Sequence, residues 1–170
     1  GLGDVYKRQG DNWDQSDYMN ECISLGEEIR TLSENITVIF GNVALEKGKI
    51  NPDGRIRKYN AMFIAQNGKF IAPGRSPYPF YIKTLLPDYR EFDDLRYFTS
   101  LTEVAAERHA FPEDFLSPLH LTFKNGDELL IGPLICEDSW DENYAVKPMS
   151  YLNDSYDIDL YVNISNSPFT

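Results

Sequence analysis

Two Asn-Gly dipeptides, each set between short apolar runs, place the strongest constraint on the fold of this chain of 170 residues. Asn67-Gly68 follows the apolar run 59–65, and Asn125-Gly126 separates residues 121–123 from the run 128–135. Asn-Gly readily supplies the two positive φ angles of a tight hairpin, so each dipeptide predicts a pair of antiparallel strands. A fold rich in β-hairpins is therefore expected.

Helices and further strands are predicted around these hairpins. Residues 17–33 place apolar side chains three and four positions apart, which is typical of an amphipathic helix. The β-branched run 36–40 predicts a buried strand, and residues 158–164 predict the last one. Two further helices are expected over residues 101–116 and 148–152. Strands that alternate with helices indicate an α/β fold, in which helices cover a sheet.

Composition and charge exclude several classes of function. Lys and Arg total 16 against 27 Asp and Glu, and a formal net charge of −11 disfavours a nucleic-acid partner. No apolar run approaches the roughly 20 residues that a transmembrane helix needs, so no membrane partner is expected. The two cysteines, Cys22 and Cys136, are too few for a disulfide framework, which favours a cytoplasmic location. His109 and His120 lie outside any metal-ligand spacing, so no metal site is expected.

Both ends of the chain have the character of cut ends. Residues 1–9 contain neither the apolar segment nor the cleavage site of a signal peptide, and they are similar to translated sequencing-adaptor sequence. At the other end, residues 167–170 follow an apolar strand without a polar tail. We therefore expect residues 1–9 not to be native, and residues 10–170 to be a partial domain that is truncated at both ends.

Cys136 is the first candidate for a chemical role. It stands where the apolar run 128–135 ends and the acidic pair Glu137-Asp138 begins. At such a strand-to-helix turn, the backbone N–H groups that follow would stabilise a thiolate and an oxyanion. A buried structural cysteine is the alternative, and the residues alone leave both open. Cys22 lies on the apolar stripe of its helix and is expected to be a core residue.

Lys83 is the second candidate, because it places one ammonium group inside the apolar run 78–87. A buried lysine needs an acidic partner, and it could then stabilise a developing oxyanion. The segment 88–98 is dense in acidic and aromatic residues and could supply that acid. The alternative is a lysine at a strand edge that points to water, beside a solvated and salt-bridged segment.

Five segments, taken in order, carry a family resemblance. They are the strand 36–40 with Gly41-Asn42-Val43, then residues 57–61, 83–94, 135–140 and 162–169. This ordered set resembles the nitrilase, or carbon–nitrogen hydrolase, superfamily, and more narrowly the glutaminase domain of the glutamine-dependent NAD+ synthetases. The phrase KTLLPDYREFDD, followed by ICEDSWDE, favours the NAD+ synthetase branch over simple nitrilases and amidases. The resemblance implies a fragment of an αββα sandwich.

The resemblance also implies roles for single residues. The superfamily uses a Glu-Lys-Cys triad, in which Cys136 would be the nucleophile and Lys83 the lysine. Asp94 would be a candidate partner of Lys83, at a position where the family often has a glutamate. Four further residues would contact the substrate or shape its pocket: Tyr89, Glu137, Trp140 and Ser167. The triad glutamate normally lies in a Pro-Glu-Leu stretch that this sequence lacks, so no residue is assigned to it and residues 10–170 alone are expected to be inactive.

The function that the resemblance implies is hydrolysis of glutamine through a cysteine thioester. The ammonia would pass to a separate synthetase domain, which amidates deamido-NAD+ in NAD biosynthesis. ATP and magnesium would belong to that domain, and no cofactor is expected in this one. The expected partners are glutamine, the synthetase domain and a further copy of the chain. The alternatives are a stand-alone amidase or nitrilase of the same superfamily and a non-catalytic α/β module.

Overall fold

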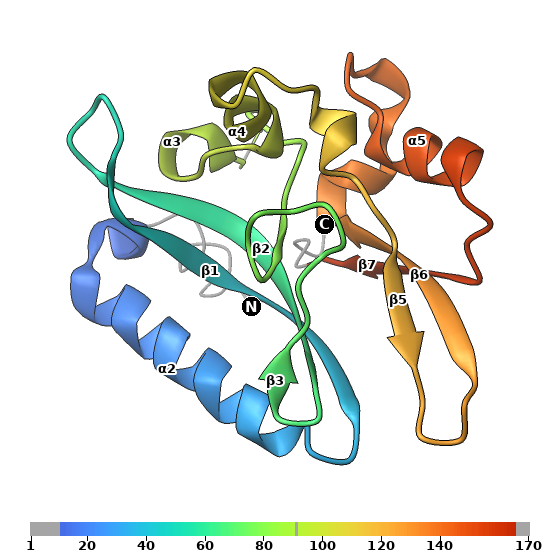
Figure 1. The fold of residues 1–170 in the computed structure, drawn as a ribbon. Helices are drawn as coiled ribbons and strands as arrows, with labels where there is room; N and C mark the ends of the chain where they lie inside the picture. Colours follow the sequence, from blue (N-terminus) through green and yellow to red (C-terminus); the bar gives the residue numbers. More distant parts are fainter. Residues whose placement is uncertain (1–10, 91, 166–170) are drawn as a thin grey trace.

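The first β-sheet carries a long helix on one face. The computed structural model describes residues 11–90 and 92–165. Strands β1 (Thr37–Ile50) and β2 (Ile56–Gln66) pair in antiparallel register, and the short strands β3 (Lys69–Phe70) and β4 (Tyr81–Ile82) both pair with β2. Helix α2 (Ser16–Leu32) follows the 3-10 helix η1 (Asp11–Asp14) and lies along β1 (Figure 1). The helix can approach β1 closely because Gly26 has no side chain at this point. A Cβ added there would lie only 2.8 Å from the Asn42 amide nitrogen.

The second sheet contains a parallel pair of strands. Strand β5 (Leu119–Thr122) runs antiparallel to β6 (Glu128–Ile135), while β7 (Leu160–Ile164) runs parallel to β6. A parallel pair needs a crossover connection, which here includes η3 (Cys136–Ser139), η4 (Asp141–Asn143) and α5 (Pro148–Ser155). Cys136 therefore lies at the carboxyl end of a parallel strand, the end at which α/β sheets bind their ligands.

The two sheets pack against each other through apolar side chains. Met62 and Ile64 of β2 are buried in one cluster with side chains of the second sheet: Leu119, Leu121, Ile131 and Ile135. Helix α2, the first sheet and the second sheet therefore form three successive layers (Figure 1). This mixed α/β architecture with two sheets confirms the predicted fold class.

The turns of the two hairpins differ in length. Asn67 and Gly68 both have positive φ, 52° and 72°, as predicted for a tight two-residue turn. In the second hairpin Phe123 N donates to Asp127 O, which leaves the three-residue turn 124–126. Within this turn the positive φ belongs to Gly126 (89°), because a three-residue turn needs a left-handed residue only at its end.

The helix predicted over 101–116 is shorter in the structure. Short helix α3 (Asp94–Tyr97) precedes α4 (Leu101–Glu107), and a separate 3-10 turn, η2 (Pro112–Asp114), follows it. The start of α4 is fixed by a capping box between Ser100 and Glu103. Its end is fixed because His109 takes a positive φ of 55° and Pro112 cannot continue a helical hydrogen-bond pattern.

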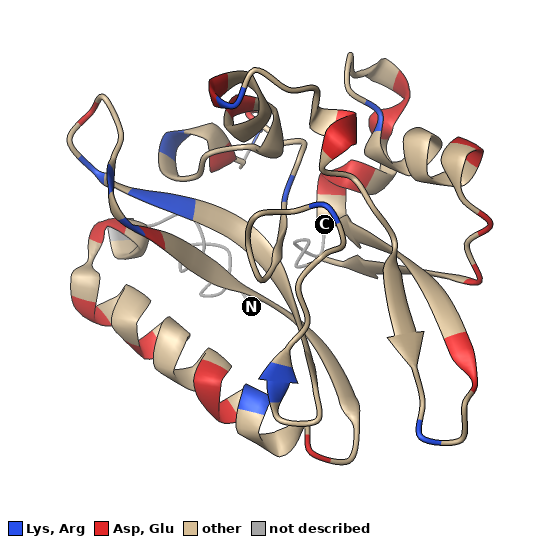
Figure 2. Ribbon diagram, viewed as in Figure 1, with Lys and Arg blue, Asp and Glu red and all other residues tan. Residues whose placement is uncertain are grey.

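The negative charge of the chain is spread over several elements. Figure 2 shows acidic residues along α2 and along the crossover from β6 to β7. Within the described parts of the chain, every helix is too short or too polar to cross a membrane.

Candidate active site

Cys136 begins η3 directly after β6, and its backbone is left-handed. Its φ is +50°, a conformation that side-chain-bearing residues adopt only when their surroundings hold them in it. Asn163 of β7 supplies that restraint, because its Oδ1 accepts a hydrogen bond from Cys136 N (2.6 Å) and its Nδ2 donates to Cys136 O (3.3 Å). The half-buried cysteine therefore lies on a sharp strand-to-helix turn of the kind that presents nucleophilic side chains in hydrolases.

Lys83 follows β4 and is buried. Its Nζ lies 2.5 Å from Asp94 Oδ2, and the lysine side chain is only 4% exposed. Its backbone is fixed on two sides, since Lys83 N donates to Asn60 O (2.9 Å) and Leu101 N donates to Lys83 O (3.1 Å). Of the two alternatives for this lysine, the structure shows the buried one, with an acidic partner from the segment 88–98.

Glu137, next to Cys136, accepts hydrogen bonds from two tyrosines. Tyr89 Oη donates to its two carboxylate oxygens (2.9 and 3.0 Å), and Tyr144 Oη donates to Oε1 (2.7 Å). The pKa of Tyr89 is raised by desolvation first, then by the bond to Glu137, with a smaller contribution from the charge of Cys136. Tyr89, one of the predicted substrate contacts, therefore bonds to the residue that directly follows Cys136.

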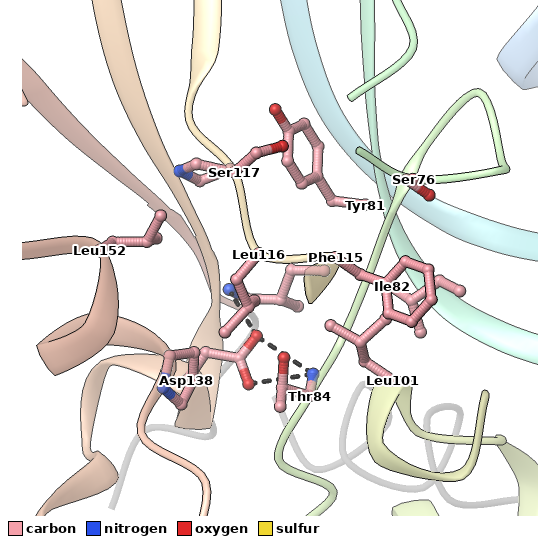
Figure 3. A pocket seen from close by; sticks show the side chains of 13 residues that line it. Ser76, Tyr81, Ile82, Thr84, Leu101, Phe115, Leu116, Ser117, Asp138 and Leu152 are labelled. Carbon is pink, nitrogen blue, oxygen red and sulfur yellow. Dashed lines mark hydrogen bonds between the residues drawn. The ribbon is translucent and has the colours of Figure 1, made fainter. Parts of the chain in front are cut away.

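Asp138 joins the segment of Lys83 to the turn of Cys136. It accepts hydrogen bonds from Leu85 N (2.8 Å), Thr84 N (3.1 Å) and Ile135 N (3.4 Å). Burial raises the pKa of this carboxyl to about 7, although the backbone donors and the charge of Lys83 act to lower it. Figure 3 shows the carboxylate pointing toward Thr84 at the edge of a small cavity.

The raised pKa of Asp138 predicts a pH-dependent stability. In the folded protein this carboxyl binds its proton more tightly than in the unfolded chain, where its pKa is near 3.8. Its contribution to stability is complete below about pH 4 and is lost as the pH rises through 7. The melting temperature of wild type relative to Asp138→Asn should therefore fall between pH 4.5 and 8. A difference that stays constant over this range would contradict the assignment.

Trp140 and Ser167 are the remaining residues that the sequence predicted for the site, whereas His120 was expected to have no role in it. Trp140 directly follows η3 and is 71% exposed. Ser167 lies outside the described residues. His120 is exposed and pairs with Glu128 (3.3 Å) at the surface. Across residues 11–90 and 92–165, no group of three or more His, Cys, Asp or Glu side chains is placed to hold a metal ion.

Sequence reasoning assigned no role to Asn163 or Asp138. Both act on the backbone of residues far away in the sequence, so no local pattern reveals them. A signal for Asn163 was available in its position on a strand that follows a helical crossover, since such a strand lies beside the strand that precedes Cys136. Together the two residues organise the turn around the thiol.

Comparison with known proteins found similar proteins of one kind. No family model matches the chain. A glutamine-dependent NAD(+) synthetase from Synechocystis sp. is 29% identical over 153 residues, a match that covers 86% of this chain and 24% of that protein. The crystal structure of a glutamine-dependent NAD(+) synthetase from Cytophaga hutchinsonii matches with a TM-score of 0.54 and 19% identity, over 94% of this chain and 22% of that one.

The two matches carry different weight. At 19% identity, the likeness to the solved structure supports the fold. The sequence match supports a common family and confirms the resemblance predicted from the ordered segments. The chain is therefore similar to glutamine-dependent NAD(+) synthetases and spans about a quarter of the length of the proteins that it matches.

Proposed function

We propose that this chain is the glutaminase part of a glutamine-dependent NAD+ synthetase, and that the full-length protein hydrolyses glutamine at Cys136. The observation that carries the proposal is the left-handed turn at Cys136, held from both sides by the Asn163 amide. A strained backbone at the end of a strand is characteristic of functional sites. The relative from Synechocystis, whose name states glutamine dependence, supports this choice of substrate.

The proposed reaction proceeds in two halves. The Cys136 thiolate attacks the side-chain amide carbon of glutamine, which forms a C–S bond and moves the carbonyl π electrons onto oxygen. The Lys83 ammonium and the backbone N–H of Glu137 would stabilise this oxyanion, at a few kcal/mol per donor. As the oxyanion collapses, the C–N bond breaks and the nitrogen takes up the proton that the thiol released, leaving as ammonia. Water then attacks the thioester, releases glutamate and restores the thiol.

The general base that holds the thiol proton is not assigned to any described carboxylate. Asp94 is paired with Lys83, Glu137 accepts from two tyrosines, and Asp138 accepts from three backbone N–H groups. We place this base outside the present sequence, in the Pro-Glu-Leu stretch that the chain lacks. Residues 10–170 alone would then not turn over glutamine.

In the full-length protein, the ammonia would serve a second reaction. A synthetase domain would use ATP and magnesium to amidate deamido-NAD+ with it. Glutamine, this synthetase domain and a further copy of the chain are the proposed partners, and the cytoplasm is the proposed location. The domain described here would need no cofactor of its own, because cysteine chemistry and hydrogen-bond donors suffice for amide hydrolysis.

Substrate comparison and thiol labelling test this function in the full-length protein. Ammonia release from glutamine should exceed that from simple aliphatic amides by at least about 100-fold, because the site would bind the amino-acid end of glutamine. A diazoketone analogue of glutamine should label Cys136 and spare Cys22. Comparable rates with aliphatic amides would instead identify a stand-alone amidase. Equal labelling of the two cysteines, or none, would identify a non-catalytic module.

A further inference from the structure

We propose that Asp138 is a positioning residue, which fixes the segment that carries Lys83 against the turn that carries Cys136. The proposal rests on the function proposed above, because the two side chains that it positions are those of the proposed reaction. It assigns to Asp138 an effect on the rate of that reaction that is exerted through Lys83.

The hydrogen bonds of Asp138 connect the two sheets at the site. Oδ1 accepts hydrogen bonds from Thr84 N and Leu85 N, which belong to the two residues that follow Lys83 in the segment after β4. Oδ2 lies 3.4 Å from Ile135 N, at the end of β6 and directly before Cys136. One carboxylate therefore bonds to residues adjacent to both proposed catalytic side chains (Figure 3).

The segment after β4 depends on this carboxylate for hydrogen bonding. Strand β4 ends at Ile82, so Thr84 and Leu85 lie beyond the sheet, and both are buried. A buried backbone N–H needs an acceptor, and Asp138 provides one for both residues. Without it, the backbone next to Lys83 would lose its attachment to the second sheet. Displacements of about 1 Å at a reacting group can lower a rate by about 100-fold.

The surroundings of Asp138 allow a truncated variant to keep its fold. A cavity of about 20 Å³ lies beside the carboxylate, and its mostly apolar lining includes the hydroxyl-bearing residues Tyr81, Thr84 and Ser117. None of these three hydroxyls has a hydrogen-bond partner among the described residues. A cavity of this size has room for about one water molecule, to which the three hydroxyls could bond. Truncation of Asp138 to alanine would enlarge this space, and a water bonded to the hydroxyls would replace the lost acceptor without fixing the Lys83 segment.

A double-mutant cycle with Lys83 tests the proposal in the full-length protein. The readout is the rate at which the diazoketone analogue of glutamine labels Cys136, followed by intact mass for hours so that very slow variants remain measurable. Asp138→Ala should slow labelling at least about 30-fold, and Lys83→Met at least about 100-fold. If Asp138 acts through Lys83, the double variant should be within about threefold of Lys83→Met alone. A fully additive loss would overturn the proposal.

Two matched variants separate positioning from general loss of structure. Asp138→Asn keeps a side-chain oxygen for Thr84 and Leu85, so it should recover labelling to within about tenfold of wild type. Asp141→Ala removes another buried aspartate of the same crossover, which bonds Ser150 N (2.8 Å) and Ser150 Oγ (3.0 Å) instead of the Lys83 segment. Its effect should be additive with that of Lys83→Met. An Asn variant no better than Ala would contradict the role of the acceptor.

The outcomes also separate this proposal from the proposed function. A wild-type protein that neither hydrolyses glutamine nor labels at Cys136 would overturn the function itself. A wild type that does both, combined with additive losses in the cycle, would overturn the role of Asp138 alone. Circular dichroism of each variant checks the fold. Should Asp138→Ala unfold, Asp138→Ser takes its place in the cycle, because its hydroxyl is a smaller change that still cannot reach both segments.

Discussion

Serine in place of Cys136 should lower the rate of glutamine hydrolysis by the full-length protein at least about 1000-fold. A serine hydroxyl is a far weaker nucleophile than a thiolate at neutral pH, and the carboxylate base proposed for the full-length protein is too weak to ionise it. The fold should persist, because Asn163 holds residue 136 through backbone N and O rather than through the side chain. Ammonia release measures the rate, and thermal unfolding checks that the variant is folded.

Cys22→Ser is the matched control for this experiment. Cys22 is half-buried on α2, and burial raises the pKa of its thiol, so it is not suited to act as a nucleophile. Its backbone oxygen, which accepts from Asn42 Nδ2 (2.6 Å), is unchanged by the substitution. Activity should stay within about twofold of wild type. Near-wild-type hydrolysis by Cys136→Ser would remove Cys136 from the mechanism.

Local signals predicted the elements of the fold that depend on neighbouring residues. The hairpin at Asn67-Gly68 is determined by its own turn residues, and the amphipathic helix α2 by the spacing of its own apolar side chains. The length of β1 was not predictable in the same way. This strand continues beyond the apolar run, because β2 pairs with it without interruption from Thr37 to Leu45 and again, after a register shift, at Ile50.

The site could be predicted only where its chemistry is visible in the residue type. Cys136 and Lys83 attract attention because a thiol after an apolar strand and a lysine in an apolar run are unusual. Asp138 lies in a run of acidic residues, and its partner Thr84 is 54 positions away. Its importance arises from the folded backbone, which brings an acceptor to N–H groups that the sheet leaves unpaired. Such contacts require the three-dimensional structure.

Lys83→Met should lower the rate of glutamine hydrolysis at least about 100-fold, and a second buried lysine provides the comparison that identifies the cause. Lys58 of β2 is as deeply buried as Lys83, with side-chain exposures of 3% and 4%. Its Nζ donates to Trp13 O (2.5 Å) and to Asp14 Oδ1 (3.0 Å). Both lysines are thus paired with an aspartate, but Lys58 is bonded to the η1 segment, whereas Lys83 lies beside the residues held by Asp138.

The two methionine variants should differ in activity and agree in stability. Each leaves an aspartate without its cation, so each should lose roughly 1–3 kcal/mol of unfolding free energy. Only Lys83→Met removes the charge proposed to stabilise the oxyanion, so only it should lower kcat, while Lys58→Met should retain kcat within about twofold. Equal losses of kcat in the two variants would show that a buried ion pair matters to this protein through folding alone. A selective loss in Lys83→Met would instead show that the position of one ammonium group, rather than its burial, determines catalysis.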